Sequence, residues 1–99
     1  MKNIVLFTLL IVCQTALAQS ILKGRVISGD TQNPLPSVSV YLNNTSLGTI
    51  TNEKGEFTIR KIPAVKFRLV ASLVSYETYE RMLDPHDIAD TVFIISLKP

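Results

Sequence analysis

The stretch from Pro34 to Phe57 constrains the fold of this chain more than any other segment. After two prolines, polar and apolar side chains alternate strictly, a pattern typical of a β-strand with one buried face. The apolar members of this strand are Val38, Val40 and Leu42. Turn-forming residues then separate it from two short strands expected at 49–51 and 56–60. The stretch therefore predicts three consecutive antiparallel strands.

The remainder of the chain continues this pattern of short strands. Further strands are expected at residues 20–28, 66–74, 75–82 and 91–97. The loop at 84–90 has room for one helical turn, and no segment shows the period of a longer helix. About seven short strands between turn signals predict a two-sheet antiparallel β-sandwich with a single core.

The first eighteen residues are expected to be an export signal. Lys2 precedes an apolar run from Ile4 to Val12, and Ala16-Leu17-Ala18 gives the small-residue pattern of a cleavage site. The run is about half of the roughly 20 residues that a membrane-spanning helix needs. We therefore expect residues 1–18 to be removed, leaving one domain at 19–99 without a transmembrane segment.

Cys13, the only cysteine of the chain, allows an alternative in which the signal is that of a lipoprotein. The bulky Val12 before it is unfavourable for lipid attachment, so we expect Cys13 to leave with the signal. The exported domain would then contain no disulfide.

Charge gives no reason to expect a nucleic-acid or anionic-lipid partner. Nine of the ten basic residues and all eight acidic ones follow residue 18, so the exported domain is nearly neutral. A domain of this length without disulfides lies near the lower limit for an independent core. A partner could therefore matter for its stability.

Three phrases of the sequence resemble the carboxypeptidase regulatory-like domain, a transthyretin-like (prealbumin-like) β-sandwich. The first is the Gly-x-Val strand at Gly24-Arg25-Val26. The second is Pro-Leu-Pro followed by alternating residues, at 34–42, and the third is Gly-Thr-Ile-Thr-Asn-Glu-Lys-Gly-Glu-Phe at 48–57. Ser75-Tyr76 approaches a fourth family phrase. The resemblance implies a seven-stranded antiparallel Greek-key sandwich.

The sequence departs from the family pattern at Ser37, Asn52 and Ser75, where the family usually has Gly, Asp and Gly. Serine accommodates a positive φ less readily than glycine. Asn52 keeps the turn chemistry of aspartate without its charge. These departures leave the expected fold unchanged.

The resemblance implies a non-catalytic, exported accessory or interaction module of the periplasm or outer membrane. Such domains occur beside carboxypeptidases and at the N-terminus of TonB-dependent receptors that import glycans and other nutrients. The expected partner is an envelope protein or outer-membrane receptor, with a glycan as a further candidate. Two alternatives are a truncated fragment of such a receptor and a small ligand-binding or hydrolytic transthyretin-like protein.

Catalytic and cofactor-binding residues are not expected in this chain. His86 is its only histidine, whereas a zinc peptidase needs two histidines and a glutamate, and there is no Gly-x-Ser-x-Gly elbow. A metal cluster is conceivable in the 84–90 loop, but a solvated polar loop is the preferred interpretation. Its members would be Asp84, His86, Asp87 and Asp90.

Three tyrosines are the candidate contact residues. By the alternation, Tyr41, Tyr76 and Tyr79 fall at outward or boundary positions, where they could form a patch that contacts a glycan or a protein. Cross-strand packing on the sandwich surface explains them equally well. The overlapping glycosylation sequons at 43–46 are interpreted as ordinary turn chemistry.

Overall fold

The computed structural model describes residues 21–88 and 91–99, and the expected signal peptide at 1–18 lies outside them. Seven strands and one short helix make up the described chain, so the prediction of a seven-stranded all-β sandwich is confirmed. The elements are β1 (Ile21–Ser28), β2 (Ser39–Leu42), β3 (Gly48–Ile50), β4 (Glu56–Arg60), β5 (Phe67–Ser72), β6 (Tyr79–Leu83), the 3₁₀ helix η1 (Pro85–Asp87) and β7 (Val92–Leu97).

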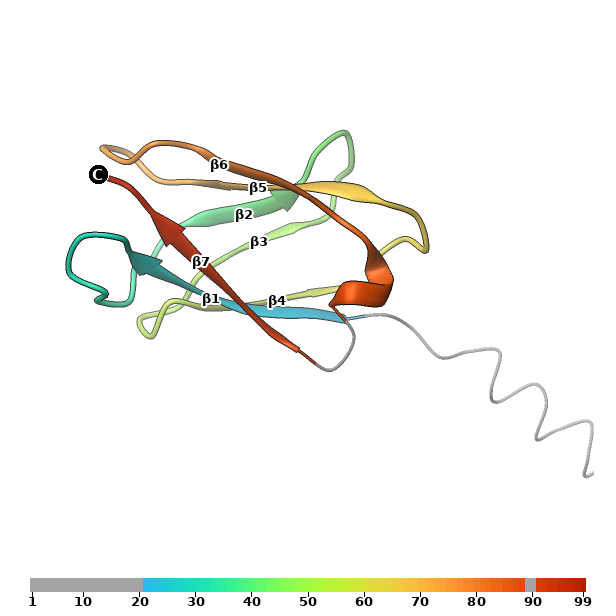
Figure 1. Cartoon of the computed structure of the whole chain (residues 1–99), viewed down its shortest axis with the longest axis horizontal. Coiled ribbons are helices and arrows are strands. Elements are labelled where there is room, and N and C mark those ends of the chain that lie inside the picture. The colour runs from blue at the N-terminus through green and yellow to red at the C-terminus, as the bar shows by residue number, and fades with distance from the viewer. Residues whose placement is uncertain (1–20, 89–90) are drawn as a thin grey trace, which may run out of the picture.

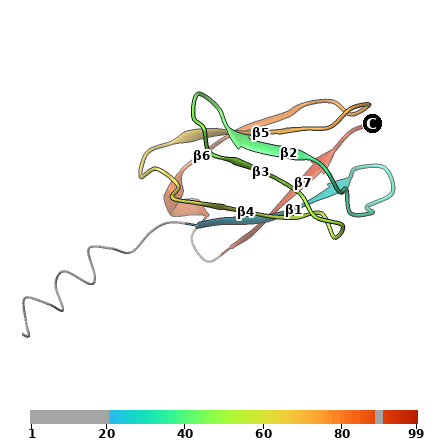
Figure 2. The same cartoon turned by 180° about the vertical axis from the view of Figure 1, so that it is seen from behind.

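The strands form two sheets that face each other (Figure 1). One sheet has the order β4-β1-β7 and the other β3-β2-β5-β6. Edge strands β3 and β4 lie next to each other on one side of the sandwich, as the view from behind also shows (Figure 2). In the described residues, no helix is long and apolar enough to cross a membrane.

The prediction that all strands pair in antiparallel fashion is wrong for one pair. β7 runs parallel to β1, with Lys23 opposite Val92 and Ser28 opposite Leu97. The chain reaches β7 from the last strand of the other sheet and enters beside the beginning of β1 (Figure 1). Side-chain alternation reports which face a residue occupies and carries no information on strand direction. The Greek-key connectivity stays a prediction.

The core lies between the two sheets, and the predicted alternation places it correctly. Leu22 and Val26 of β1 are fully buried, as are Val40 and Leu42 of β2. Further buried side chains are Val38, Phe57, Ile59, Ile62, Phe67, Leu69, Ala71, Leu83, Ile88, Ile95 and Leu97. Each large apolar side chain buried in this way contributes roughly 1.5–3 kcal/mol, which offsets the entropy of ordering a small chain.

The inward position 24 of β1 requires a glycine, because the core leaves no room for a side chain there. It lies opposite Phe57 in the ladder of β1 and β4. A Cβ atom on Gly24 would lie 2.4 Å from Cζ of Phe57 and 2.5 Å from the carbonyl oxygen of Phe93. An inward glycine in a strand predicts such a close approach, and the structure confirms it.

The strands expected at 37–42, 66–74 and 75–82 begin or end differently in the structure, and backbone conformation explains the first and the last of these differences. β2 begins at Ser39 because Ser37 has φ of 63°, which is incompatible with a strand. β6 begins at Tyr79 because Ser75 has φ of 75° and Tyr76 N–H donates to the carbonyl of Leu73 in a turn. Both serines thus adopt the left-handed conformation for which glycine is the usual residue.

A glycine in a hairpin, such as Gly48 between β2 and β3, predicts a positive φ at that position, but Asn44 takes this conformation instead, with φ of 62°. The glycine at 48 serves a different purpose. A Cβ atom there would lie 2.8 Å from Cβ of Tyr41 on the neighbouring strand. Gly48 therefore allows β3 to pack closely against Tyr41.

Candidate interaction surfaces

The turn between β3 and β4 is held by the side chains of Thr51 and Asn52. The buried Thr51 hydroxyl donates to the Leu35 carbonyl (2.7 Å) and accepts from Val38 N–H (2.9 Å). Asn52 Oδ1 accepts from the N–H groups of Lys54 (3.0 Å) and Glu56 (2.9 Å). The proline-marked entry to β2 and the turn are thereby connected, which fixes the course of the chain on this side.

Gly55 closes the same turn against β1. It has φ of 74°, and its carbonyl accepts from Val26 N–H at 2.8 Å. The Val26 carbonyl in turn accepts from Leu35 N–H at 3.0 Å. The phrases at 34–42 and 48–57 are therefore both hydrogen-bonded to the same residue of β1, Val26.

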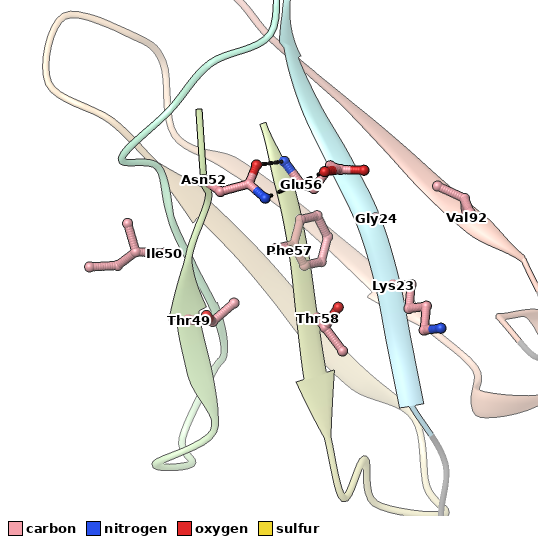
Figure 3. Close-up of a pocket in the computed structure, with 9 residues that line it drawn as sticks. All are labelled: Lys23, Gly24, Thr49, Ile50, Asn52, Glu56, Phe57, Thr58 and Val92. Atoms are coloured by element: carbon pink, nitrogen blue, oxygen red, sulfur yellow. Dashed lines mark hydrogen bonds between the residues drawn. The ribbon is translucent and has the colours of Figure 1, made fainter. Parts of the chain in front are cut away.

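An open hollow of about 470 Å³ lies beside this turn (Figure 3). It reaches from β3 across β4 and β1 to β7 and is lined by Lys23, Gly24, Thr49, Ile50, Asn52, Glu56, Phe57, Thr58 and Val92. Figure 3 shows the side-chain amide of Asn52 hydrogen-bonded to Glu56 at the start of β4, with Phe57 next along the strand. This lining mixes one cation, one anion, threonines and exposed apolar groups, and it holds no histidine or cysteine. The hollow therefore suits contact with a surface or an extended chain better than chemistry on a small substrate.

The structure does not bring the three candidate tyrosines together in one patch. Tyr41 pairs with Val70, and Val70 with Glu80, on the outer face of the four-stranded sheet. Tyr79 pairs with Ala71, an inward residue, so it lies on the opposite face and packs against the core. Tyr76 is also half-buried against the core. Tyr41, 39% exposed, is the member whose ring is most available for contact. Contact of any of the three with a partner stays a prediction.

On the outer face of β2, β5 and β6, Tyr41 lies among apolar Val70 and Met82 and the charged residues at 68 and 80. Val70 lies beside it and is 97% covered although it points away from the core, and Met82 is half-exposed nearby on β6. Alternation along the strand expected at 66–74 predicts this outward face for Val70 but gives no indication of its burial. The covered valine means that its neighbours on the sheet shield it, leaving Tyr41 and Met82 as the accessible members.

In the described part of the 84–90 loop, the side chain of Asp84 caps the short helix η1. Asp84 Oδ1 accepts from His86 N–H at 3.0 Å, and the residue caps η1, which contains the predicted helical turn. Asp90 lies outside the described residues. Over 21–88 and 91–99, no group of three or more histidines, cysteines and acidic residues is arranged to hold a metal. Asp84 thus has a structural role in this loop.

β7 presents a surface that the sequence interpretation did not single out. Val92 and Ile94 are 61% and 52% exposed on the outer face of the three-stranded sheet. The signal was visible in the sequence, because inward residues at 93, 95 and 97 place Val92, Ile94 and Ser96 outward. Two of those outward residues are apolar, which is unusual for a solvated strand.

These features define a small β-sandwich whose accessible chemistry lies in sheet faces and edges. The chain belongs to the carboxypeptidase regulatory-like family: the model of the CarboxypepD_reg-like domain matches residues 22–97. The match extends from β1 to the end of β7 and confirms the resemblance inferred from the sequence phrases.

A solved structure shares the fold. It is a chain of the type II cohesin–X–dockerin complex from Acetivibrio cellulolyticus, crystallised as a C-terminal interface mutant, with a TM-score of 0.54 and 16% identity. The alignment covers 80% of this chain and 51% of that one, so the present chain corresponds to about half of its length. The likeness concerns the fold alone. The search of curated proteins found no match.

Proposed function

We propose that the protein is a non-catalytic interaction module of the cell envelope, exported to the periplasm or outer membrane. In this role it contacts an envelope protein or outer-membrane receptor connected with nutrient uptake, glycan uptake in particular. The observation that carries the proposal is the family match over 22–97, which accounts for every strand of the sandwich. The regulatory-like family is one of accessory domains.

The geometry supports contact through surfaces. The hollow beside β4 is open and of mixed polarity, and Tyr41 and Met82 offer exposed apolar groups on a rigid sheet. The similar sandwich from Acetivibrio cellulolyticus comes from a complex between proteins, which illustrates that this fold can take part in assembly. Such surfaces recognise a partner by shape and apolar contact, with no bond made or broken.

Two alternatives remain distinct from this proposal. In the first, the sequence is a truncated N-terminal fragment of a TonB-dependent receptor, and the DNA beyond the Pro99 codon tests this case by the presence or absence of plug and barrel sequence. A small ligand-binding or hydrolytic protein is the second alternative. His86 is its only histidine base, so an activity that survives His86→Ala would exclude a His86-based hydrolase.

Export is tested by the mass of the protein recovered from the envelope. Cleavage after Ala18 predicts a chain that begins at Gln19, without Cys13. A mass that retains residues 1–18, or that includes a lipid on Cys13, would contradict the proposed processing.

The contact surface is tested by photo-crosslinking in cells. A photoreactive amino acid at Tyr41 should capture an envelope protein, because this side chain is exposed on a sheet face. The matched control carries the same group at Arg60, which is exposed at the end of β4 on the other sheet and outside the hollow. A specific adduct from position 41 supports the proposal, whereas identical patterns from both positions would count against recognition through this face. Binding of the protein to a glycan is tested separately, by affinity electrophoresis in polysaccharide gels.

A further inference from the structure

The free edge of β7 differs from every other sheet edge in the described chain. Its sequence, from Val92 to Leu97, contains no charged residue, proline or glycine. β7 pairs with β1 on one side, and no pairing is found on its other side within residues 21–88 and 91–99. An uncharged edge of six residues is an effective template for another strand.

The hydrogen-bonding pattern shows which backbone groups of β7 are available. Gly29 N–H donates to the Leu97 carbonyl at 2.7 Å, so the backbone groups of Leu97 face β1. In a parallel ladder the residues that face the partner alternate, which gives Phe93 and Ile95 the same direction. The N–H and C=O groups of Val92, Ile94 and Ser96 therefore point away from β1, toward the free edge.

The available edge has a defined end. Glu77 N–H donates to the Lys98 carbonyl at 2.7 Å, so the β5–β6 loop occupies the edge just after Leu97. The free stretch runs from Val92 to Ser96, and Ile94 is its midpoint.

The other edges carry features that oppose pairing. β4 has Glu56 and Arg60 at its ends, and β6 carries Glu80 and Arg81. β3 is only three residues long. Charges and short length are the usual means of protecting an edge. β7 has neither charges nor a short length. A monomer with exposed apolar side chains at a sheet edge would need such protection against pairing with another chain.

We infer that β7 pairs antiparallel with β7 of a second copy of this chain, about a two-fold axis at Ile94. In this register Ile94 lies opposite its counterpart and Val92 lies opposite Ser96 of the other copy. Each of these residues directs both backbone groups at the partner, so every free group between Val92 and Ser96 is satisfied at once. The two three-stranded sheets then become one continuous sheet.

Self-pairing also agrees with the charges and the side chains at this edge. Within the paired strands themselves no like charges meet, because β7 carries none. The outward side chains of Val92 and Ile94 come next to those of the second copy and lose part of their exposure to water. Pairing closes at the dimer, because the remaining edge of the enlarged sheet is the charged β4 at both ends.

A cysteine placed on the two-fold axis tests the register directly. With Cys13 replaced by serine, Ile94→Cys leaves one thiol per chain, and pairing brings the two Cα atoms to about 5.5 Å, within disulfide range. The matched control, Val92→Cys, is similarly exposed, but its Cα lies about 14 Å from that of the second copy, since the two are offset by four residues of 3.3 Å along the strands and by about 5.5 Å across them. Ile94→Cys should form disulfide dimers under mild oxidation much faster than Val92→Cys. Equal rates would overturn the proposed register.

Sedimentation of the purified wild-type protein over a wide concentration range tests the association without a cross-link. We expect a monomer–dimer equilibrium that Ile94→Lys weakens by at least about tenfold, since it places like charges opposite each other. Ile50→Lys, an equally exposed substitution on β3, should leave the equilibrium unchanged. A wild-type monomer at all concentrations, or species larger than a dimer, would overturn the inference. The result is independent of envelope capture through Tyr41, so either proposal can fail without the other.

Discussion

The two open sides of the sandwich are built in different ways. On the side of β3 and β4, side chains of Thr51 and Asn52 hold the backbone where strand pairing stops. On the side of β6 and β7, side-chain contact across the sheets includes the Arg81 guanidinium, 5.3 Å from the centre of the Phe93 ring. The first side has several hydrogen bonds from buried or turn side chains, whereas the second has an exposed cation over an aromatic ring and one backbone bond from Glu77 N–H to the Lys98 carbonyl.

This difference separates the part that specifies the fold from the part that remains available for contact. The residues of the family phrase at 48–57 are engaged with β1 and with the entry to β2. The free backbone groups of β7 have no such engagement. Substitutions on the first side should therefore change the free energy of unfolding, whereas those on the second should mainly change association.

The largest expected effect is that of Gly55→Ala. A Cβ atom at this position would lie 2.4 Å from the Val26 carbonyl oxygen, and φ of 74° is unfavourable for alanine. We expect a loss of about 3 kcal/mol in the free energy of unfolding, measured with urea. Gly29→Ala, near β7, is the control, because its tightest contact is the rotatable Ser96 hydroxyl at 2.9 Å. An equal loss in both variants would contradict the contrast between the two sides.

Thr51→Val should have the next largest effect. Valine has nearly the same shape but leaves the Leu35 carbonyl and Val38 N–H without their buried partner. The expected loss is about 2 kcal/mol in the free energy of unfolding. The control Thr58→Val, at an exposed position of β4, should change stability little. A loss below that of the control would mean that water replaces the hydroxyl without cost.

Much of this fold is predictable from local patterns in the sequence. Val38, Val40 and Leu42 alternate with polar residues, so their burial follows from the period of a strand. Asn52 and Gly55 stand where a tight turn needs a side-chain acceptor and a positive φ. These requirements are satisfied within a few residues, so the sequence alone contains them.

Features that depend on distant segments are not predictable in this way. The parallel pairing of β7 with β1 is set by how the chain crosses between sheets. The alternation puts both Tyr41 and Tyr79 at outward or boundary positions, yet the register places them on opposite faces of one sheet. To predict which residues form a surface across several strands, the register between the strands must be known, and no local pattern in the sequence gives that register.

Ser37→Gly and Ser75→Gly should each raise the free energy of unfolding by about 1 kcal/mol. Both serines have φ between 63° and 75°, where a Cβ atom is unfavourable and glycine is not. Ser37 precedes β2 and Ser75 precedes β6, so the pair compares the two sides with the same substitution. Ser46→Gly, which lies outside the positive-φ residues, should be neutral or slightly destabilising because it only loosens the unfolded chain. Stabilisation at 46 as well would argue against relief of backbone strain.

Arg81→Ala should have the smallest effect, about 0.5 kcal/mol in the free energy of unfolding. The guanidinium covers Phe93 where the two sheets meet near β7, but it remains exposed, so solvent weakens its attraction to the ring. Arg68→Ala, on the outer face of the adjacent strand, is the control for removal of an exposed arginine. Because Arg81 also places charge near the β7 edge, its removal should leave self-association intact or strengthen it. A loss as large as that of Thr51→Val would show that both sides contribute equally to the fold.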